Sequence, residues 1–186
     1  MHVRLIRHGI TAGNAARRYV GVTDEPLSPE GRAQAEQKEK DFSPERIYVS
    51  PLKRARETAA ILFPNAEQVP VYDLREMDFG VFEGRTADEM ADDPVYRAWV
   101  DDLCRGTCPG GESQADFHRR TVAAFSDVMR KTAGDTTFVV HGGVIMALMS
   151  NLGQGEFYDF LCGNGAGYVC DWRGGRLTLE EKLWQD

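Results

Sequence analysis

Apolar and polar residues follow one another in short blocks that predict strands alternating with helices. Runs rich in apolar and β-branched residues predict strands at 2–6, 46–49, 69–72 and 136–140. Apolar residues at helical spacing over 52–63, and a nearly continuous apolar stretch over 144–152, predict helices. Residues 166–184 predict a hairpin that turns at Gly174-Gly175.

Two hydroxyl residues mark the starts of further helices. Ser28 precedes Pro29 at the first helical position, so we expect a helix from there to about Lys40. Ser113 caps a long helix that reaches about Lys131. The segment between, 73–112, is rich in glycine and acidic residues and predicts irregular structure with short helical pieces. Strands alternating with helices indicate a three-layer α/β/α sandwich with a mostly parallel central sheet.

The composition fits one globular domain over 1–186, because 42% of residues are hydrophobic and 27% are charged. No apolar run approaches the roughly 18–20 residues of a membrane span, and the N-terminus does not resemble a signal peptide, so we expect a cytoplasmic protein. The net charge of −7 argues against nucleic acid or a membrane surface as partner. The four cysteines contain no C-x-x-C pair and predict free thiols.

The first candidate for chemistry is Arg7-His8-Gly9, where the first strand ends. A histidine at such a turn can face a cleft, and Gly9 would let the backbone approach a ligand. The guanidinium of Arg7 fits phosphate oxygens in a bidentate manner. Asn14 could donate one more hydrogen bond. His8 alone could equally be a structural turn residue.

Two further candidates follow strands. Arg54 lies in the first turn of the helix after strand 46–49, and His141-Gly142-Gly143 ends strand 136–140. In open α/β sheets ligands bind at the carboxyl ends of strands, so these residues would meet at one edge. Arg56 we expect in solvent.

A fourth segment, LREMDFGVFEG at 74–84, offers Glu76 and Glu83 as candidate carboxylic acids. Any single glutamate in an acidic protein is by default a surface residue. The spacing does not choose between the two.

Together these segments resemble the histidine phosphatase superfamily, which includes phosphoglycerate mutases and α-ribazole phosphatases. The matching motifs are RHGITAGN at 7–14, SPLKRARETA at 50–59, LREMDFGVFEG at 74–84 and HGG at 141–143. Their order and spacing match over nearly the whole chain. The resemblance implies a phosphoglycerate mutase-like fold, with 85–112 as an insertion that covers the site. Ile10 departs from the motif, since many relatives have Glu or Gln there, which affects substrate detail rather than the reaction.

Carried over position by position, the resemblance implies a role for each matching residue. His8 would be the nucleophile, Glu76 the proton donor and later the base, with Arg7, Arg54 and His141 around the phosphate. Phosphate or substrate contacts would come from Asn14, Thr23, Gly142 and Glu83.

The chemistry of the implied reaction suits these residue types. A nucleophilic histidine must be neutral, and neighbouring arginines disfavour its protonated form. Two arginines and a second histidine could supply the positive charge that Mg²⁺ supplies elsewhere, so we expect neither metal nor cofactor. The expected substrate is a small phosphorylated metabolite, with α-ribazole 5′-phosphate as one candidate, hydrolysed by a monomer or homodimer.

Three alternatives remain open from the sequence. A mutase would use the same residues, but mutase relatives usually have a longer chain with a tail over the site, so we expect hydrolysis. Metal-assisted hydrolysis could use His8, His118, His141 and a cysteine, although the ligand spacing is poor. The fold could also serve as a non-catalytic phosphate-binding module.

Overall fold

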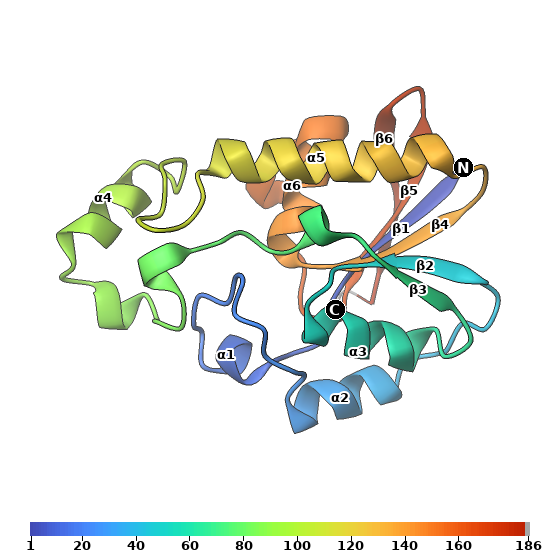
Figure 1. Cartoon of the computed structure of the whole chain (residues 1–186), viewed down its shortest axis with the longest axis horizontal. Coiled ribbons are helices and arrows are strands. Elements are labelled where there is room, and N and C mark those ends of the chain that lie inside the picture. Colours follow the sequence, from blue (N-terminus) through green and yellow to red (C-terminus); the bar gives the residue numbers. More distant parts are fainter. Residues whose placement is uncertain (185–186) are drawn as a thin grey trace.

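One mixed six-stranded sheet forms the centre of the computed structural model, which describes residues 1–184 (Figure 1). The strands lie in the order β3 (Glu67–Pro70), β2 (Arg46–Val49), β4 (Thr136–Val140), β1 (His2–Arg7), β5 (Gly167–Arg173) and β6 (Arg176–Leu183). Neighbours are parallel from β3 to β1, and the hairpin β5–β6 joins antiparallel at β1. The prediction of a mostly parallel sheet with a terminal hairpin is confirmed.

Helices cover both faces of the sheet (Figure 1). One face carries α2 (Pro29–Glu36) and α3 (Lys53–Leu62), and the other carries α5 (Gln114–Lys131) and α6 (Gly142–Leu152). Alternate strand residues supply the two cores: Val3 and Leu5 pack with α5 and α6, while Ile6 packs with α3. No helix within residues 1–184 has both the length and the hydrophobicity to cross a membrane.

Short helical pieces connect the main elements, and those within 73–112 agree with the predicted irregular segment. They are α1 (Ala12–Ala15), η1 (Tyr72–Leu74), η2 (Gly80–Phe82), η3 (Asp88–Met90), α4 (Pro94–Asp101) and η4 (Phe157–Phe160). The segment that contains η3 and α4 extends away from the sheet, beyond the start of α5 (Figure 1). The four cysteines are free thiols, as predicted.

Two predicted boundaries are wrong. The helix α2 ends at Glu36 rather than near Lys40, and the chain then turns so that Asp41 bonds to Arg4 (2.6 Å) and to the Leu62 carbonyl (2.9 Å). These tertiary contacts end the helix early. The strand β3 occupies Glu67–Pro70 rather than 69–72, because its register with β2 pairs Arg46 with Glu67. On an edge strand polar residues are tolerated, so hydrophobicity did not mark its start.

We predict that Phe138→Ala lowers the free energy of unfolding by about 3–5 kcal/mol, as for other buried phenylalanines. Phe138 is fully buried in β4 and packs against Tyr48 and Phe125, with ring centroids 5.4 and 5.0 Å away. Urea denaturation measures the loss. As a matched control, Phe42→Ala removes a ring that is 59% exposed and should change stability by no more than about 0.5 kcal/mol. Equal losses in the two variants would contradict this description of the core.

Candidate active site

Two histidines lie side by side because they follow neighbouring parallel strands. Arg7 pairs in register with Val140, and the backbone N–H of His8 donates to the Val140 carbonyl at 3.0 Å. The rings of His8 and His141 meet edge to face, with centroids 5.0 Å apart. Both side chains are buried, so the pair lies inside the protein at the carboxyl edge of the sheet.

Hydrogen bonding fixes the tautomer of His8. Its Nδ1 lies 2.7 Å from the Gly9 carbonyl, which can only accept, so Nδ1 carries the proton. Nε2 therefore holds a lone pair, and it accepts a hydrogen bond from Arg54 Nε at 3.2 Å. Burial, then the charges of Arg54 and Arg7, lower the pKa of His8 well below its ordinary value. These effects favour a neutral ring, in which Nε2 is the nitrogen with the lone pair.

Arg54 is fully buried and holds the loop after α1 as well as His8. Its Nη1 donates to the Thr23 carbonyl and its Nη2 to the Gly21 carbonyl, both at 2.7 Å. The hydroxyl of Thr58, one turn along α3, donates to the Arg54 carbonyl and accepts from the Gly9 amide at 2.9 Å. The helix α3 thus ties the guanidinium to the turn that carries His8. By contrast, Arg56 is exposed, as predicted.

Two buried nitrogens of the site have no hydrogen-bond partner among residues 1–184. Arg7 donates from Nη1 to the Cys162 carbonyl at 2.6 Å, but its Nε has no partner in this part of the chain. His141 contacts the Ser50 hydroxyl through Nε2 at 2.6 Å, and its Nδ1 likewise has no partner among the described residues. Buried polar groups are almost always hydrogen-bonded, so these two nitrogens are available for hydrogen bonds to an anion bound in the site.

The hydroxyl of Ser50 lies beside Nε2 of His141. Its Oγ accepts from the Leu52 amide at 3.4 Å and lies 2.6 Å from His141 Nε2. In the tautomer in which this hydroxyl donates to Nε2, Nδ1 of His141 carries the ring proton. Burial, followed by the charges of Arg54, His8, Arg7 and Arg120, lowers the pKa of His141 well below its ordinary value, which favours the neutral ring.

Glu76 is the carboxylic acid at the site, and it is only 8% exposed. Its oxygens accept from the amides of Met77 (2.9 Å) and Gly143 (3.0 Å). Burial raises the pKa of Glu76, and this effect exceeds the lowering by the two amides and by Arg54 and Arg7. The carboxyl therefore keeps its proton to a higher pH than an exposed glutamate does.

The two glycines after His141 leave room for these groups. A Cβ at Gly143 would lie 2.3 Å from Glu76 Oε1, and one at Gly142 would lie 3.2 Å from Arg7 Nε. Larger residues would therefore force Glu76 away and crowd Arg7. This explains in steric terms why glycines begin α6.

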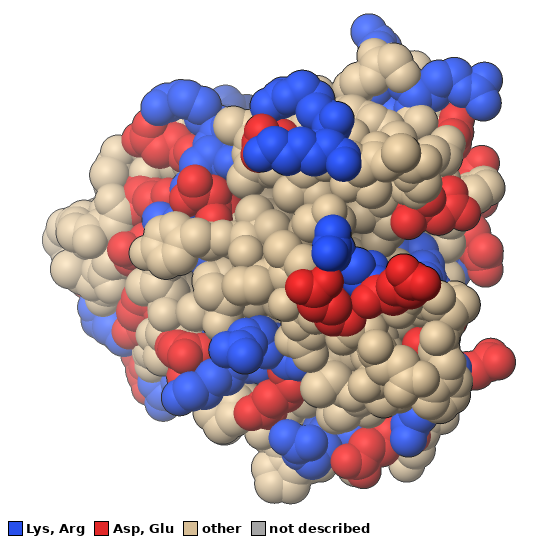
Figure 2. Space-filling view, turned by 45° about the vertical axis from the view of Figure 1, so that its right-hand side comes forward, with Lys and Arg blue, Asp and Glu red and all other residues tan. Residues whose placement is uncertain are grey.

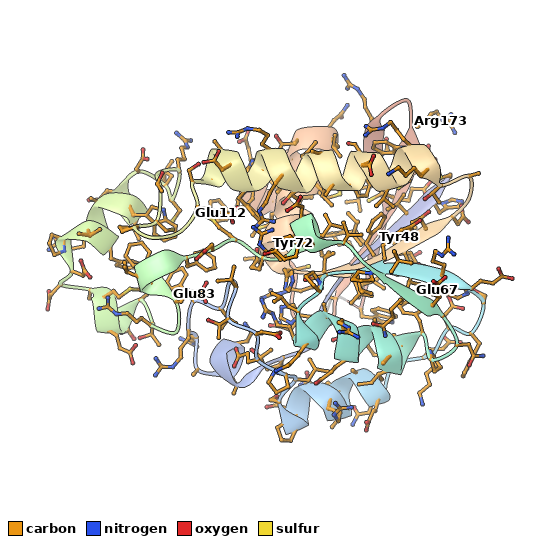
Figure 3. All side chains as sticks on the ribbon, in the orientation of Figure 1. Tyr48, Glu67, Tyr72, Glu83, Glu112 and Arg173 are labelled. Carbon is orange, nitrogen blue, oxygen red and sulfur yellow. The ribbon has the colours of Figure 1, made fainter. Side chains whose placement is uncertain are left out.

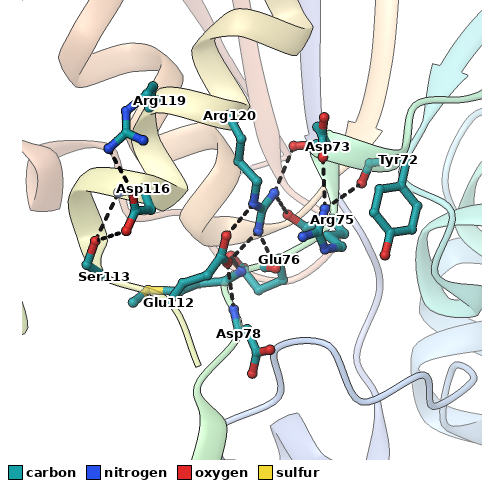
Figure 4. Close-up of polar contacts among 11 residues, drawn as sticks. Tyr72, Asp73, Arg75, Glu76, Asp78, Glu112, Ser113, Asp116, Arg119 and Arg120 are labelled. Atoms are coloured by element: carbon teal, nitrogen blue, oxygen red, sulfur yellow. Dashed lines mark hydrogen bonds and ion pairs between the residues drawn. The ribbon is translucent and has the colours of Figure 1, made fainter. Parts of the chain in front are cut away.

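A residue that the sequence analysis missed, Arg120 on α5, holds the backbone around Glu76 (Figure 4). Its guanidinium donates to the carbonyl oxygens of Asp73, Arg75 and Glu76 at 2.8–2.9 Å. It also pairs with both carboxylate oxygens of Glu112, at 2.6 and 2.7 Å. The helix α5 thus positions a catalytic candidate that lies on an irregular segment. Only the folded arrangement distinguishes Arg120 from its exposed neighbour Arg119.

A cavity of about 320 Å³ opens beside these groups, and Arg7, Glu76, Gly142, Gly143 and Asn14 all border it. Two of the residues predicted to contact substrate, Thr23 and Glu83, do not. Glu83 accepts from the amides of Gly21, Val22, Thr23 and Phe79 and from the Thr23 hydroxyl. It lies next to the loop that follows α1 (Figure 3) and fixes the carbonyls that bind Arg54.

The residues considered as metal ligands, His8, His118, His141 and a cysteine, do not form one group in the described structure. His118 lies on α5, stacks on Phe157 with centroids 5.1 Å apart, and contacts Asn151 at 3.1 Å. Within the part of the chain that the structure describes, no three His, Cys, Asp or Glu side chains are grouped as metal ligands.

On the face drawn in Figure 2, acidic and basic side chains are interspersed rather than gathered by sign.

We predict that Arg120→Gln loosens the segment that carries Glu76, because three backbone carbonyls and Glu112 lose a buried partner. Hydrogen–deuterium exchange of the amides in residues 73–79 should become at least about tenfold faster, a cost of about 1.4 kcal/mol or more. The matched control is Arg119→Gln, whose side chain is 73% exposed and, among the described residues, pairs with Asp116 in its own helix. Equal exchange rates in the two variants would contradict the view that Arg120 holds the backbone around Glu76 in place.

Comparison with known proteins agrees with this geometry. The family model described as histidine phosphatase superfamily (branch 1) matches residues 3–185. The chain is 35% identical to "Probable phosphoglycerate mutase GpmB" of Yersinia pestis, over 82% of this chain and 74% of that protein. Its fold resembles the α-ribazole phosphatase of Shigella flexneri (TM-score 0.85, 26% identity, 98% and 96% of the two chains). It also resembles a phosphoglycerate mutase of Thermus thermophilus (TM-score 0.77, 32% identity, 100% of both chains). The chain belongs to branch 1 of the histidine phosphatase superfamily.

Proposed function

We propose that this protein hydrolyses a small phosphomonoester through a phosphohistidine on Nε2 of His8, without a metal ion. The observation that carries the proposal is the pair of unpartnered buried nitrogens, Arg7 Nε and His141 Nδ1, beside a neutral His8. Oxygens of a bound phosphate would accept from both. Arg7 and Arg54 would supply fixed positive charge where negative charge develops on the phosphoryl group.

The first half of the reaction transfers the phosphoryl group to the enzyme. The Nε2 lone pair of His8 attacks phosphorus, and the bond from phosphorus to the ester oxygen breaks with its electron pair left on that oxygen. Glu76 gives this oxygen its proton, so the product leaves as a neutral alcohol. The Arg54 Nε–H, which bonds Nε2 in the free enzyme, moves to a phosphoryl oxygen.

The second half returns the enzyme to its starting state. Glu76, now a carboxylate, takes a proton from water as the water oxygen attacks phosphorus. The P–N bond breaks, its electrons return to His8 Nε2, and inorganic phosphate leaves. Dividing one displacement into two through a covalent intermediate is the usual advantage of nucleophilic catalysis.

Transfer to a second substrate is the alternative, and the names of the Yersinia and Thermus relatives favour it. A mutase would return the phosphoryl group to a sugar acid rather than to water. We favour hydrolysis, with α-ribazole 5′-phosphate as one candidate substrate, as the name of the Shigella protein suggests. Release of inorganic phosphate in the absence of any acceptor alcohol distinguishes the two reactions.

We predict that His8→Ala abolishes turnover, with kcat reduced about 10³-fold or more, because the nucleophile is lost. Release of inorganic phosphate from 4-nitrophenyl phosphate measures the rate, and circular dichroism checks the fold. The control, His2→Ala, removes an exposed ring that pairs with Glu180 and should stay within about twofold of the wild type. A His8→Ala variant with more than about a tenth of wild-type turnover would refute the nucleophile.

We predict that kcat/KM does not fall as the pH is lowered through 6.5, because the lowered pKa of His8 keeps the nucleophile neutral there. The rate should fall with rising pH as Glu76 loses its proton, with a midpoint above the ordinary glutamate pKa of 4.5. Steady-state kinetics from about pH 4 to 9 check both limbs. A loss of kcat/KM centred at pH 6.5 or above as the pH is lowered would contradict the buried, neutral His8.

A comparison of two substrates tests whether Glu76 donates a proton to the leaving group. In Glu76→Gln, phosphorylation by an alkyl phosphate should slow about 10²–10⁴-fold, whereas the first-turnover burst from 4-nitrophenyl phosphate should persist. Nitrophenolate leaves without a proton, so only the alkyl ester needs the acid. An equal loss on both substrates would show that Glu76 acts in some other way.

A further inference from the structure

Aromatic residues make up a third of the lining of the cavity beside Arg7 and Glu76. They are Tyr19, Phe79, Trp99, Phe117, Phe157 and Tyr158. Its volume of about 320 Å³ lies at the lower end of the roughly 300–1,000 Å³ of pockets that enclose small organic ligands. A three-carbon sugar acid would leave much of this space to water.

One group of rings is held rigidly by its own contacts. Tyr19 meets Phe79 and Trp99 edge to face, with centroids 5.1 and 5.9 Å apart. The Tyr19 hydroxyl is hydrogen-bonded to that of Tyr96 at 2.9 Å. Trp99 lies on α4, within the segment 85–112 that we expect to cover the site. These rings are therefore in place before a ligand binds.

A second group lies on η4, where Phe157 and Tyr158 meet edge to face at 5.1 Å. Phe157 stacks on His118 of α5 at an interplanar angle of 27°, which fixes its ring. Tyr158 is 56% exposed although it borders the cavity, so it lies at the mouth. A large ring left open to solvent here has surface that a ligand can cover.

Charged side chains are few in the cavity beyond Arg7 and Glu76. Apart from Arg7 and Glu76, the charged side chain among the lining residues of the described chain is Arg18. It is already engaged, since it makes a bidentate pair with Glu89 at 3.0 and 3.1 Å and donates to the Gly84 carbonyl. A carboxylate on the leaving group would have to compete with Glu89 for Arg18.

We propose that this cavity binds the leaving group and selects phosphomonoesters of uncharged alcohols that carry a planar aromatic ring, over small acidic sugar phosphates. The inference rests on the proposed function, because a phosphoryl group at His8 is what directs the rest of the substrate into the cavity. Edge-to-face and offset contacts with the preformed rings favour a planar aromatic group, and its burial removes apolar surface from water.

The test compares kcat/KM for 2-phenylethyl phosphate, ethyl phosphate and 3-phosphoglycerate. The three esters are all alkyl phosphates, so each needs Glu76 and the comparison reports mainly on binding of the organic part. We expect at least about a tenfold preference for 2-phenylethyl phosphate over each of the other two. A preference below tenfold, or a preference for 3-phosphoglycerate, would overturn the assignment of the cavity.

Failure of the proposed function would look different. In that case wild-type protein would release no phosphate from any of the three esters, or His8→Ala would release it as fast as the wild type. Failure of the cavity assignment alone would leave all three esters hydrolysed in a His8-dependent manner, without the aromatic preference.

Two substitutions locate the preference in the structure. Tyr158→Ala and Phe157→Ala should each lower the ratio of kcat/KM for 2-phenylethyl over ethyl phosphate at least about fivefold. The control is Tyr72→Ala, a tyrosine that is 68% exposed and lies outside the cavity, and it should leave the ratio unchanged. Thermal melting verifies the fold of all three. An unchanged ratio in both cavity variants would overturn the assignment.

Discussion

The rest of this site depends on the contact between the buried guanidinium of Arg54 and the buried imidazole of His8. Arg54 is fully enclosed, and its Nε–H meets Nε2 of His8 at 3.2 Å. This contact, with the Gly9 carbonyl on the other ring nitrogen, decides which nitrogen of His8 can react and keeps it unprotonated. An enclosed positive charge is costly by itself, so the surrounding structure must compensate it.

That compensation comes from loops rather than from the sheet. Carbonyls of Gly21 and Thr23 accept from Arg54, and Glu83 holds this loop by accepting its amides. On the other side of the site, Arg120 fixes the backbone at Glu76 in a similar way. The sheet brings the two histidines together, whereas carboxylate and guanidinium clamps position the groups that come from irregular segments.

The sequence was sufficient for the parts of this structure that have a local signal. Strand hydrophobicity, the Ser28 and Ser113 caps and the residues that end β1 and β4 predicted the sheet and the cluster around His8. Glu83 was predicted to contact substrate because of its motif, but it accepts from the amides of Gly21 and Val22, which are distant in sequence, and no spacing reveals these partners. Arg120 looked like any helical arginine.

The aromatic cavity was beyond sequence analysis for the same reason. Its rings come from the loop after α1, the start of η2, α4, α5 and η4, and none is periodic with another. Only folding shows that they border one space, next to Arg7 and Glu76. The proposed specificity therefore depends largely on segments outside the sheet, while the sheet positions the proposed nucleophile His8.

The role of His8 is tested most directly by identifying the nitrogen that carries the phosphoryl group during turnover. Enzyme trapped during turnover and examined by phosphorus and nitrogen NMR should show one acid-labile phosphoramidate, on Nε2 of His8, because Nδ1 is protonated and bonded to Gly9. A phosphoryl group on Nδ1, on another residue, or on no residue at all during turnover would contradict the account.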